Sequence, residues 1–413
     1  MRLSALYRRA VLTVATVVSM LAATSCTQYW GIEKKHGEVS RAVLIFLGGN
    51  NNLQNYMRNN LYDIYESSSL PGYTSDTVVL VFEHFNQESP RLKRCYRTDN
   101  GNVISEILTV YEESFSSATA ECFAQVEKDA FSRFPARSKG LIISSHGSAW
   151  MPEGYYSFPI DFSEARIQQF ISERALDEGI VKGAEEIIQG KSISSDNNND
   201  REIDIIEWAK AINEHYEFIC MDACFMSSIE VAYEMRHTAD YILASPTEIL
   251  AYGYPYQAVF DNLIKGGETN LKNFCSEMLD YHVQAGRTCT ISLIKCSELE
   301  PLASYCKTLY AAHSAEKAAV SPYLVQPFFR YSDDWFYDFG DYVEQFVTAS
   351  EYQTFCGYLN RVIIAKANTS RFLSLPINKN SGFNTYIPKA RYPKLNAYYK
   401  TLEWNKATSS IGE

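Results

Sequence analysis

Two residues with reactive side chains each follow a short apolar run, and their types suit covalent catalysis. Cys224 ends the stretch Phe218–Cys224, and His146 ends the stretch Gly140–His146. A thiolate can attack a carbonyl carbon, and an imidazole can move the protons that such a reaction releases and consumes. A cysteine with a histidine in reach is therefore the smallest set of side chains that supports this chemistry.

The apolar runs predict the elements that position these two residues. Runs of this length, bounded by polar residues, are typical of buried strands. Ser227–Glu230 begins a helical pattern, so Cys224 lies between a strand and a helix. Unpaired N–H groups and the helix dipole favour a thiolate at such a place. If the two strands are neighbours in a parallel sheet, His146 and Cys224 emerge at the same edge.

A structural role for either residue is the alternative. Buried cysteine is common in protein cores, and a histidine can end a strand without any catalytic function. The catalytic interpretation is favoured because both residues close apolar runs and His146 is followed by the small residue Gly147. His84 also ends a predicted strand and is the alternative base.

Asp222 precedes Cys224 by two positions, so both side chains point to the same face of the predicted strand. A carboxylate beside the nucleophile would by itself disfavour the thiolate, whereas a substrate cation would offset that effect. An Arg side chain can bind a carboxylate through two parallel hydrogen bonds. The alternative is an aspartate that caps the following helix.

The motifs around these residues resemble the clostripain family of cysteine peptidases (family C11), which shares the caspase-like fold. The resemblance covers residues 40–260 well and the remainder loosely. It rests on SSHGSAW, MDACFMSSIEVAYEM and ADYILASPTEILAYGYPY, and also on LIFLGGNNNLQNYM and SISSDNNNDREIDIIEWAKAI. The resemblance implies a peptidase with a catalytic dyad of His146 and Cys224 and no third residue.

The resemblance also gives expectations for the other site residues. The family's aspartate that matches Asp222 lines the S1 pocket and selects Arg or Lys. Ser245, Thr247 and Glu248 follow the next predicted strand and are expected to complete that pocket. The oxyanion is expected to be held by the backbone N–H groups of Gly147 and Cys224.

The expected function is a cysteine endopeptidase that cleaves peptides or proteins after Arg or Lys through an acyl-enzyme. One rival is an amidohydrolase that uses the same Cys/His pair on a non-peptide amide. Another rival is an inactive surface lipoprotein that binds glycans or peptides through the aromatic region 321–348.

Residues 150–200 are polar and broken, and they predict an insertion between the two catalytic strands. An enzyme that cuts after basic residues can cut itself in such a segment. Lys191 is the expected site, because the resembled family has a basic residue at a matching place as its self-processing point. The alternative sites are Arg166, Arg174 and Lys182, and the alternative role is a plain surface loop.

An acidic segment within and after this insertion has the spacing of an EF-hand-like loop. The six matching positions are Asp196, Asn198, Asp200, Glu202, Asp204 and Glu207. Arg201 stands where such a loop needs glycine, so an acidic turn followed by a helix cap is the favoured interpretation. The resembled family includes calcium-dependent members. No cofactor is expected to be required, and calcium stays open, with Asp196, Asn198 and Asp200 as its ligands.

Residues 1–26 predict an export signal. Arg2, Arg8 and Arg9 precede an apolar run that is too short for a membrane span, and small residues then precede Cys26. This pattern favours a bacterial lipoprotein signal with lipid on Cys26, and an ordinary signal peptide is the alternative. The expected location is the cell envelope, anchored to the outer membrane or cell surface, or otherwise secreted or periplasmic.

Length and composition predict a folded α/β protein. The chain has 413 residues, of which 46% are hydrophobic, and a net charge of −11 that argues against a nucleic-acid partner. Strands alternating with helices predict an open, mostly parallel sheet with helices on both faces. The expected parts are a tether (27–40), a caspase-like catalytic domain (41–265) and a smaller C-terminal α/β extension (266–413). The ten cysteines show no disulfide framework.

Overall fold

The computed structural model describes residues 36–152, 193–196, 201–329 and 335–412. Residues Glu38–Glu413 form one compact unit. The predicted signal segment, including Cys26, lies outside the described residues. No helix in the described part of the chain is long and apolar enough to cross a membrane.

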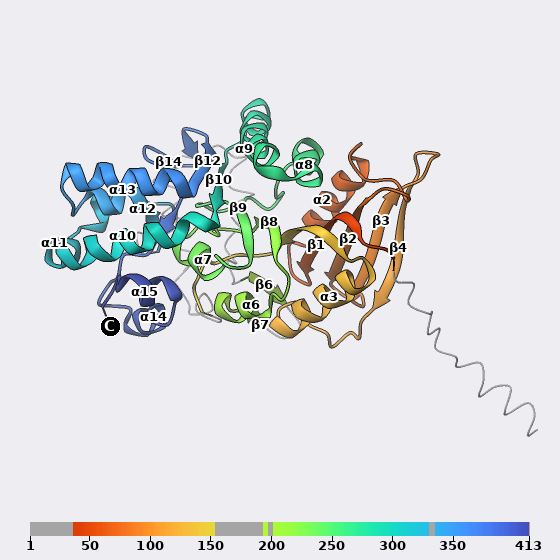
Figure 1. Ribbon diagram of the computed structural model, residues 1–413, viewed down its shortest axis with the longest axis horizontal. Coiled ribbons are helices and arrows are strands. Elements are labelled where there is room, and N and C mark those ends of the chain that lie inside the picture. Colours follow the sequence, from red (N-terminus) through yellow and green to blue (C-terminus); the bar gives the residue numbers. More distant parts are fainter. Residues whose placement is uncertain (1–35, 153–192, 197–200, 330–334, 413) are drawn as a thin grey trace, which may run out of the picture. The chain divides into compact units, whose positions relative to one another are not determined.

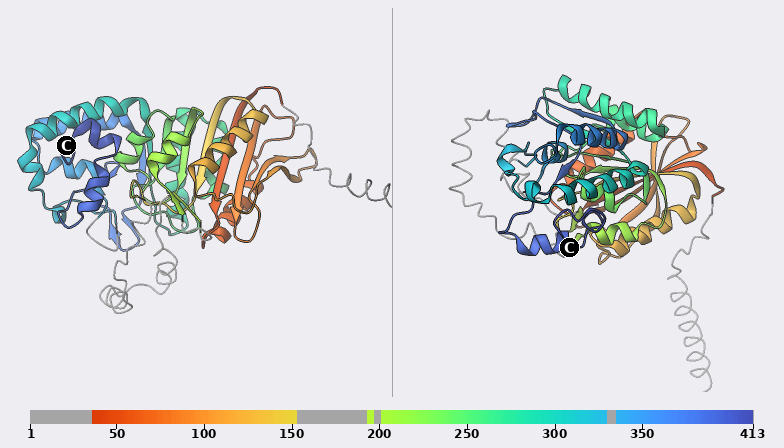
Figure 2. Two further views of the ribbon diagram at one scale, coloured as in Figure 1. Left: turned by 90° about the horizontal axis from the view of Figure 1, so that it is seen from below. Right: turned by 60° about the vertical axis from the view of Figure 1, so that its left-hand side comes forward.

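The described residues form a nine-stranded central sheet in the order β12-β10-β9-β8-β5-β1-β2-β3-β4 (Figures 1 and 2). The five central strands are parallel: β9 (Ala239–Ala244), β8 (Tyr216–Asp222), β5 (Ala136–Ser144), β1 (Val39–Gly49) and β2 (Thr77–Phe85). Antiparallel strands flank them: β3 (Arg91–Arg97), β4 (Val103–Val110), β10 (Thr290–Lys295) and β12 (Ile363–Asn368). The expected mostly parallel α/β sheet is confirmed.

Helices cover both faces of the sheet, as Figure 1 shows. One face carries α2 (Gln54–Glu66), α8 (Tyr256–Lys265) and α9 (Gly267–Gln284). The other carries α3 (Ala120–Arg133), α6 (Ile205–Ala211), α7 (Ile229–Glu234), α10 (Leu299–Ala312), α12 (Phe339–Glu344), α13 (Ala349–Val362), α14 (Pro393–Tyr399) and α15 (Glu403–Thr408). In β1, Ile45 packs on the face that carries α2, α8 and α9, and Leu44 packs on the opposite face. Successive side chains of a strand point to opposite faces of the sheet.

Several short elements complete the unit. Three two-stranded pairs are β6 (Ile193–Asp196) with β7 (Arg201–Ile203), β11 (Tyr337–Asp338) with β15 (Asn384–Thr385), and β13 (Arg371–Phe372) with β14 (Leu375–Pro376). The short helices are α11 (Ser314–Ala318), η2 (Cys296–Glu298) and η3 (Pro322–Leu324).

The C-terminal part of the chain continues the central sheet. Strands β10 and β12 extend the same sheet as the catalytic strands, so the structure has no boundary at residue 265 between two compact units.

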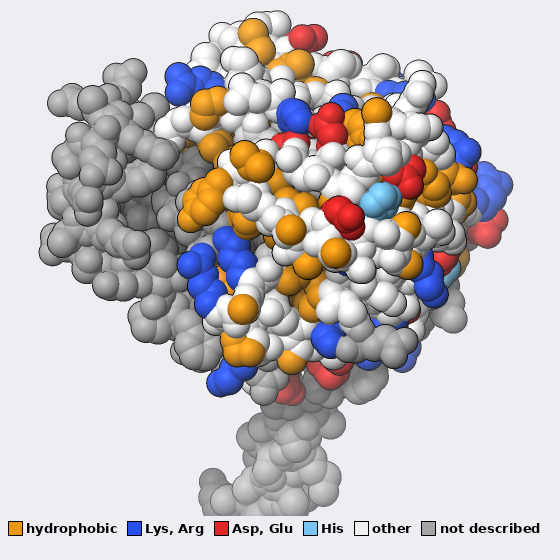
Figure 3. Space-filling view, turned by 90° about the vertical axis from the view of Figure 1, so that its left-hand side faces the viewer, with side chains coloured by type: hydrophobic (Ala, Val, Ile, Leu, Met, Phe, Trp, Pro, Cys, Tyr) orange, Lys and Arg blue, Asp and Glu red, His pale blue; other side chains and the backbone are white. Residues whose placement is uncertain are grey.

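The aromatic region 321–348 belongs mainly to the core and does not form the contact surface that the binding rival requires. Its buried aromatic residues are Phe328, Phe329, Trp335, Phe336, Tyr337, Phe339, Tyr342 and Phe346. Among the described aromatic residues of this region, Tyr323 is the exception, with 82% of its surface exposed. Figure 3 shows acidic, basic and apolar side chains interspersed on the face that carries the C-terminal helices.

Nine cysteines lie in the described residues, and none of these forms a disulfide. Seven of them are buried, and Cys224 and Cys356 are partly exposed. The buried cysteines act as small apolar residues of the core.

Candidate active site

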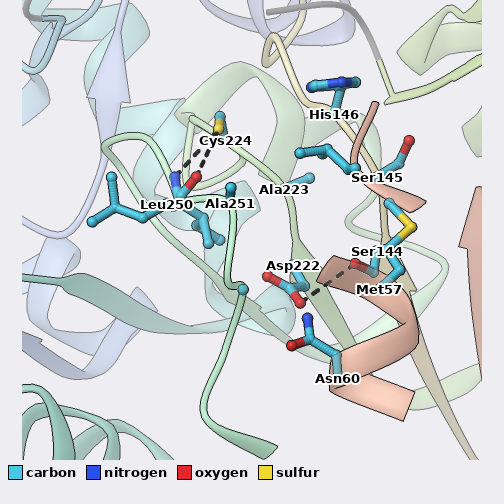
Figure 4. A pocket seen from close by; sticks show the side chains of 13 residues that line it. Met57, Asn60, Ser144, Ser145, His146, Asp222, Ala223, Cys224, Leu250 and Ala251 are labelled. Carbon is cyan, nitrogen blue, oxygen red and sulfur yellow. Dashed lines mark hydrogen bonds between the residues drawn. The ribbon is translucent and has the colours of Figure 1, made fainter. Parts of the chain in front are cut away.

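The two strands that precede His146 and Cys224 are adjacent and parallel. Strands β5 and β8 pair in a register that sets Ser144 opposite Asp222, and the backbone N–H of Ser145 donates to the carbonyl of Asp222 at 3.4 Å. His146 and Cys224 each lie two residues beyond this pair. Both residues line one pocket at the carboxyl edge of the sheet, as expected (Figure 4).

The turn that follows Cys224 has a strained backbone. Phe225 has φ of 63°, a left-handed conformation that is uncommon for an aromatic residue. Its N–H donates to the carbonyl of Thr247 at 2.8 Å, and its ring stacks on Phe336 with centroids 4.4 Å apart. Such strain persists only where the surroundings enforce it, and it is frequent at active sites.

The C-terminal segment around β15 holds this turn in place. The side-chain amide of Asn384 donates to the carbonyls of Phe225 and Pro246, each at 2.9 Å, and its backbone N–H donates to Ser227 at 2.8 Å. Glu230, buried in α7, accepts from the hydroxyl of Tyr399 at 2.7 Å. Residues distant in sequence therefore support the position of the thiol.

The thiol of Cys224 contacts the backbone of Ile249. The N–H of Ile249 donates to Sγ at 3.2 Å, and Sγ lies 3.4 Å from the carbonyl oxygen of Ile249, to which a thiol would donate. An N–H donor aimed at sulfur favours the thiolate, because it stabilises the charged form.

His146 is 7% exposed and interacts with the turn after β1. Its Nε2 lies 2.7 Å from Oδ1 of Asn52. Asn52 was not among the predicted site residues. The sequence signal that could have found it is the polar run Gly48–Asn52, which directly follows a buried strand at the same sheet edge.

Gly147 packs directly against the backbone of the nucleophile. A Cβ atom at this position would lie 2.6 Å from the carbonyl oxygen and 2.8 Å from the nitrogen of Cys224. Both distances are too short for any side chain, so the close approach of the two backbones requires glycine. This contact brings together the two residues that were expected to supply the oxyanion site.

The pocket beside Cys224 has Asp222 at its inner end (Figure 4). Its volume is about 520 Å³, including the open space at the mouth. Residues from α2, the two catalytic strands and the loop after β9 line it: Leu53, Met57, Asn60, Ser144, Ser145, His146, Asp222, Ala223, Cys224, Ile249, Leu250, Ala251 and Gly253.

Asp222 is a buried carboxyl group with hydrogen bonds but no cationic partner. Its Oδ2 accepts from the hydroxyls of Tyr256 at 3.0 Å and Ser144 at 3.4 Å. Burial raises the pKa of this carboxyl from 3.8 to about 6, and the hydrogen bonds oppose that rise only in part. No lysine or arginine among the described residues pairs with it. The inner end of the pocket is therefore suited to an incoming positive charge.

A family model described as the clostripain family matches residues 45–161 and 178–404. The chain belongs to the clostripain family. Its fold matches an inactive zymogen of a C11 protease from Parabacteroides distasonis at 30% identity and a TM-score of 0.73, over 90% of this chain and 99% of that chain. The comparison with curated proteins gave no match.

Two further solved structures resemble this clostripain-family chain in fold. A secreted C11 cysteine protease from Bacteroides thetaiotaomicron has 24% identity and a TM-score of 0.72, over 90% of this chain and all 100% of that chain. A secreted C11 cysteine protease from the same organism, in complex with an irreversible peptide inhibitor, has 22% identity and a TM-score of 0.70. The match covers 89% of this chain and 98% of that chain. The caspase-like fold of this cysteine peptidase is confirmed.

A second glycine, Gly253, forms part of the wall of the pocket beside Asp222. Gly253 has φ of +66°, and a Cβ atom there would lie 2.8 Å from Oδ2 of Asp222 and would also collide with the amide of Asn60. The absence of a side chain leaves the carboxylate reachable from the pocket. Asn60 and Gly253 were not predicted, because neither is near Cys224 in sequence.

Three predicted pocket residues lie elsewhere. Ser245 and Thr247 are fully buried, and their hydroxyls meet Thr290 at 2.7 and 2.8 Å. Glu248 is also buried, and none of the three lines the pocket. The loop after β9 instead contributes Ile249, Leu250, Ala251 and Gly253, because it turns toward Cys224 only after Glu248.

The alternative base does not lie in this site. His84 is the last residue but one of β2, its Nδ1 lies 3.1 Å from the hydroxyl of Ser117, and it does not line the pocket. Among the pocket residues, His146 is thus the histidine available to assist Cys224.

Parts of the predicted site lie outside the described residues. They include the self-cleavage positions Lys191, Arg166, Arg174 and Lys182, and the calcium positions Asn198 and Asp200. Asp196 ends β6, and Asp204 caps α6 by accepting from the N–H of Ile206 at 2.8 Å, which agrees with the helix-cap interpretation. Among the described residues, no group of three acidic, histidine or cysteine side chains is arranged to hold a metal.

Proposed function

We propose that this clostripain-family peptidase is an endopeptidase that cleaves after Lys or Arg, with Cys224 as nucleophile and His146 as acid and base. The observation that supports it most is the buried carboxyl of Asp222 at the inner end of the pocket that Cys224 borders. A basic side chain before the cleaved bond would enter this pocket and place its carbonyl carbon near the thiol.

The mechanism follows from the side chains at the sheet edge. His146 accepts the proton of the Cys224 thiol, the resulting thiolate attacks the carbonyl carbon, and the backbone N–H groups of Gly147 and Cys224 stabilise the oxyanion. His146 then donates a proton to the leaving amine as the C–N bond breaks, which leaves a thioester. Water attacks the thioester with His146 as base, and the acid product and the thiol are released.

The preference for a cation follows from the electrostatics of Asp222. A buried carboxylate without a partner is costly, which is why burial raises the pKa of Asp222 to about 6. An ammonium or guanidinium group restores a charge pair, and the described part of the pocket offers no competing cation. Neutral or acidic side chains would gain nothing at this position.

Export and activation complete the proposal. The sequence of residues 1–26 supports secretion with lipid on Cys26, and the secreted relative from Bacteroides thetaiotaomicron agrees with export. Self-cleavage within 150–200 is proposed from the basic residues there, and the similar Parabacteroides distasonis structure is described as an inactive zymogen. Calcium remains an optional ligand in this proposal.

A covalent probe tests the proposal against its rivals. The full chain is incubated with a short peptide that ends in a lysyl chloromethyl ketone, and the modified residue is identified by mass spectrometry. Labelling at Cys224, lost in Cys224→Ala and weak with a glutamyl probe, is the expected result. A binding protein would not react. An amidohydrolase would hydrolyse small amides without reacting with the peptide probe, and either outcome would overturn the proposal.

A further inference from the structure

Asn52 is the polar residue of the turn after β1 that contacts the ring of His146. Its Oδ1 lies 2.7 Å from Nε2. An amide oxygen can accept a hydrogen bond but cannot donate one, so Nε2 must carry a proton in this contact. The neutral imidazole then has its lone pair on Nδ1, because only one ring nitrogen is protonated in that form.

The turn that carries Asn52 is itself held in place. The side-chain amide of Asn51 donates to the carbonyl of Gly48 at 2.9 Å, and its oxygen accepts from the N–H of Leu53 at 2.9 Å. The hydroxyl of Ser145 donates to the same Gly48 carbonyl at 3.2 Å. The residue before His146 is thus tied to the turn that contains Asn52, so the two side chains keep a fixed relation.

We propose that Asn52 is a positioning residue that fixes the tautomer and orientation of His146. By holding the proton on Nε2, it leaves Nδ1 to exchange protons with Cys224 and with the leaving amine. The inference rests on the proposed dyad and adds a third member to it, which the sequence had not indicated.

An amide suits this role better than a carboxylate. It orients the ring without adding a negative charge that would strongly favour the imidazolium, and the ring can therefore gain and release a proton within one catalytic cycle. Among the pocket-lining residues, the titratable side chains besides His146 are Cys224 and Asp222. Ionisation of Asp222 is expected to set the acid limb of the pH dependence of kcat/KM. The alkaline limb then reflects ionisation of the Cys224–His146 pair.

The test compares Asn52→Ala and Asn52→Asp with matched changes of Asn55, which is exposed on α2. The full chain is assayed with a lysyl peptide amide for kcat, KM and the pH dependence of kcat/KM. Asn52→Ala should lower kcat by about 10- to 100-fold with little change in KM, a loss of the size seen when the partner that orients a metal-bound histidine is removed. Asn52→Asp should move the alkaline limb upward by about one pH unit, because a carboxylate favours the imidazolium.

The control variants Asn55→Ala and Asn55→Asp should leave kcat and the alkaline limb as in the unaltered enzyme. An active enzyme whose Asn52 variants keep the unaltered kcat and alkaline limb would overturn the inference and leave the proposed function standing. An unaltered enzyme without amidolysis, and without labelling of Cys224, would overturn both. A loss of kcat in Asn52→Ala with an unmoved alkaline limb in Asn52→Asp would also overturn the inference, since a structural defect alone explains it.

Discussion

Ser144 and Asp222 face each other in the register of β5 and β8, and the Ser144 hydroxyl donates to the Asp222 carboxyl at 3.4 Å. This pair sets the position of the residues two places further on, His146 and Cys224. A slip of one residue would turn one of these two side chains to the opposite face. One strand pairing thus places both the reactive pair and the inner end of the pocket.

The buried carboxyl predicts a pH-dependent stability difference. The pKa of Asp222 in the folded protein, about 6, is above its ordinary value of 3.8. Its contribution to stability is therefore fully present below about pH 3.8 and is lost as the pH rises through 6. Relative to Asp222→Asn, the unaltered protein should lose about 2 kcal/mol of unfolding free energy between pH 4 and pH 8, most of a full effect of about 3 kcal/mol at about 1.4 kcal/mol per pH unit.

Denaturant unfolding of the two proteins at several pH values measures this difference. A gap between them that stays constant from pH 4 to pH 8 would show that burial does not raise the pKa of the carboxyl.

Gly253→Ala should block the pocket. The added methyl group would contact Oδ2 of Asp222, so kcat/KM for lysyl and arginyl peptide amides should fall at least about tenfold, because an overfilled site commonly costs 1–3 kcal/mol. Alkylation of Cys224 by iodoacetamide should change little, since that reagent does not need the pocket. Gly286→Ala is the matched control, because Gly286 has φ of +64° with open space around its Cβ position. Equal losses in both variants would point to backbone strain alone.

Asn384→Ala should impair catalysis from a distant part of the sequence. It removes two hydrogen bonds that hold the carbonyls of Phe225 and Pro246, which should cost about 1–3 kcal/mol of stability and lower kcat. Asn405→Ala is the control, because Asn405 is a buried asparagine of α15 that bonds to the backbone and does not line the pocket. If both variants lose stability and only Asn384→Ala lowers kcat, the hydrogen bonds of Asn384 specifically hold Cys224 in its catalytic position. Unchanged kcat in Asn384→Ala would contradict it.

The central residues of the candidate active site could be predicted from the sequence, because the patterns that indicate them lie within single short segments. Cys224 and His146 close apolar runs whose length and boundaries indicate buried strands, and Asp222 lies in the run that Cys224 closes. Parallel strands present their ends at one edge. Gly147 was found by the same logic. These residues needed only the assumption that β5 and β8 are neighbours, which the strand order confirms.

The residues that were missed depend on contacts between distant segments. Asn60 and Gly253 reach Asp222 from α2 and from the loop after β9, and Asn384 reaches the Phe225 turn from β15. No periodicity in one segment reveals such contacts. The aromatic region 321–348 was open to two interpretations for the same reason, since composition does not tell a core from a surface.

Self-cleavage should depend on the enzyme's own thiol. Unaltered and Cys224→Ala proteins are purified side by side, and the fragments are sequenced from their N-termini. Two fragments in the active protein, one of them beginning at Ser192, and one intact chain in the variant are expected if Lys191 is the cleaved position. Fragments that begin after Arg166, Arg174 or Lys182 would place the self-cleavage site at that residue. A fully active intact chain would show that self-cleavage is not required for activity.

Hydrolysis of short peptide amides that differ only in the residue before the cleaved bond tests the proposed function most directly. The unaltered enzyme should turn over lysyl and arginyl amides and leave alanyl and glutamyl amides nearly untouched. Asp222→Asn should reduce cleavage after Lys and Arg by about 2–5 kcal/mol in transition-state free energy, the usual cost of removing one partner of a desolvated charge pair. Equal turnover of alanyl, glutamyl and lysyl amides by the unaltered enzyme would contradict the proposed specificity.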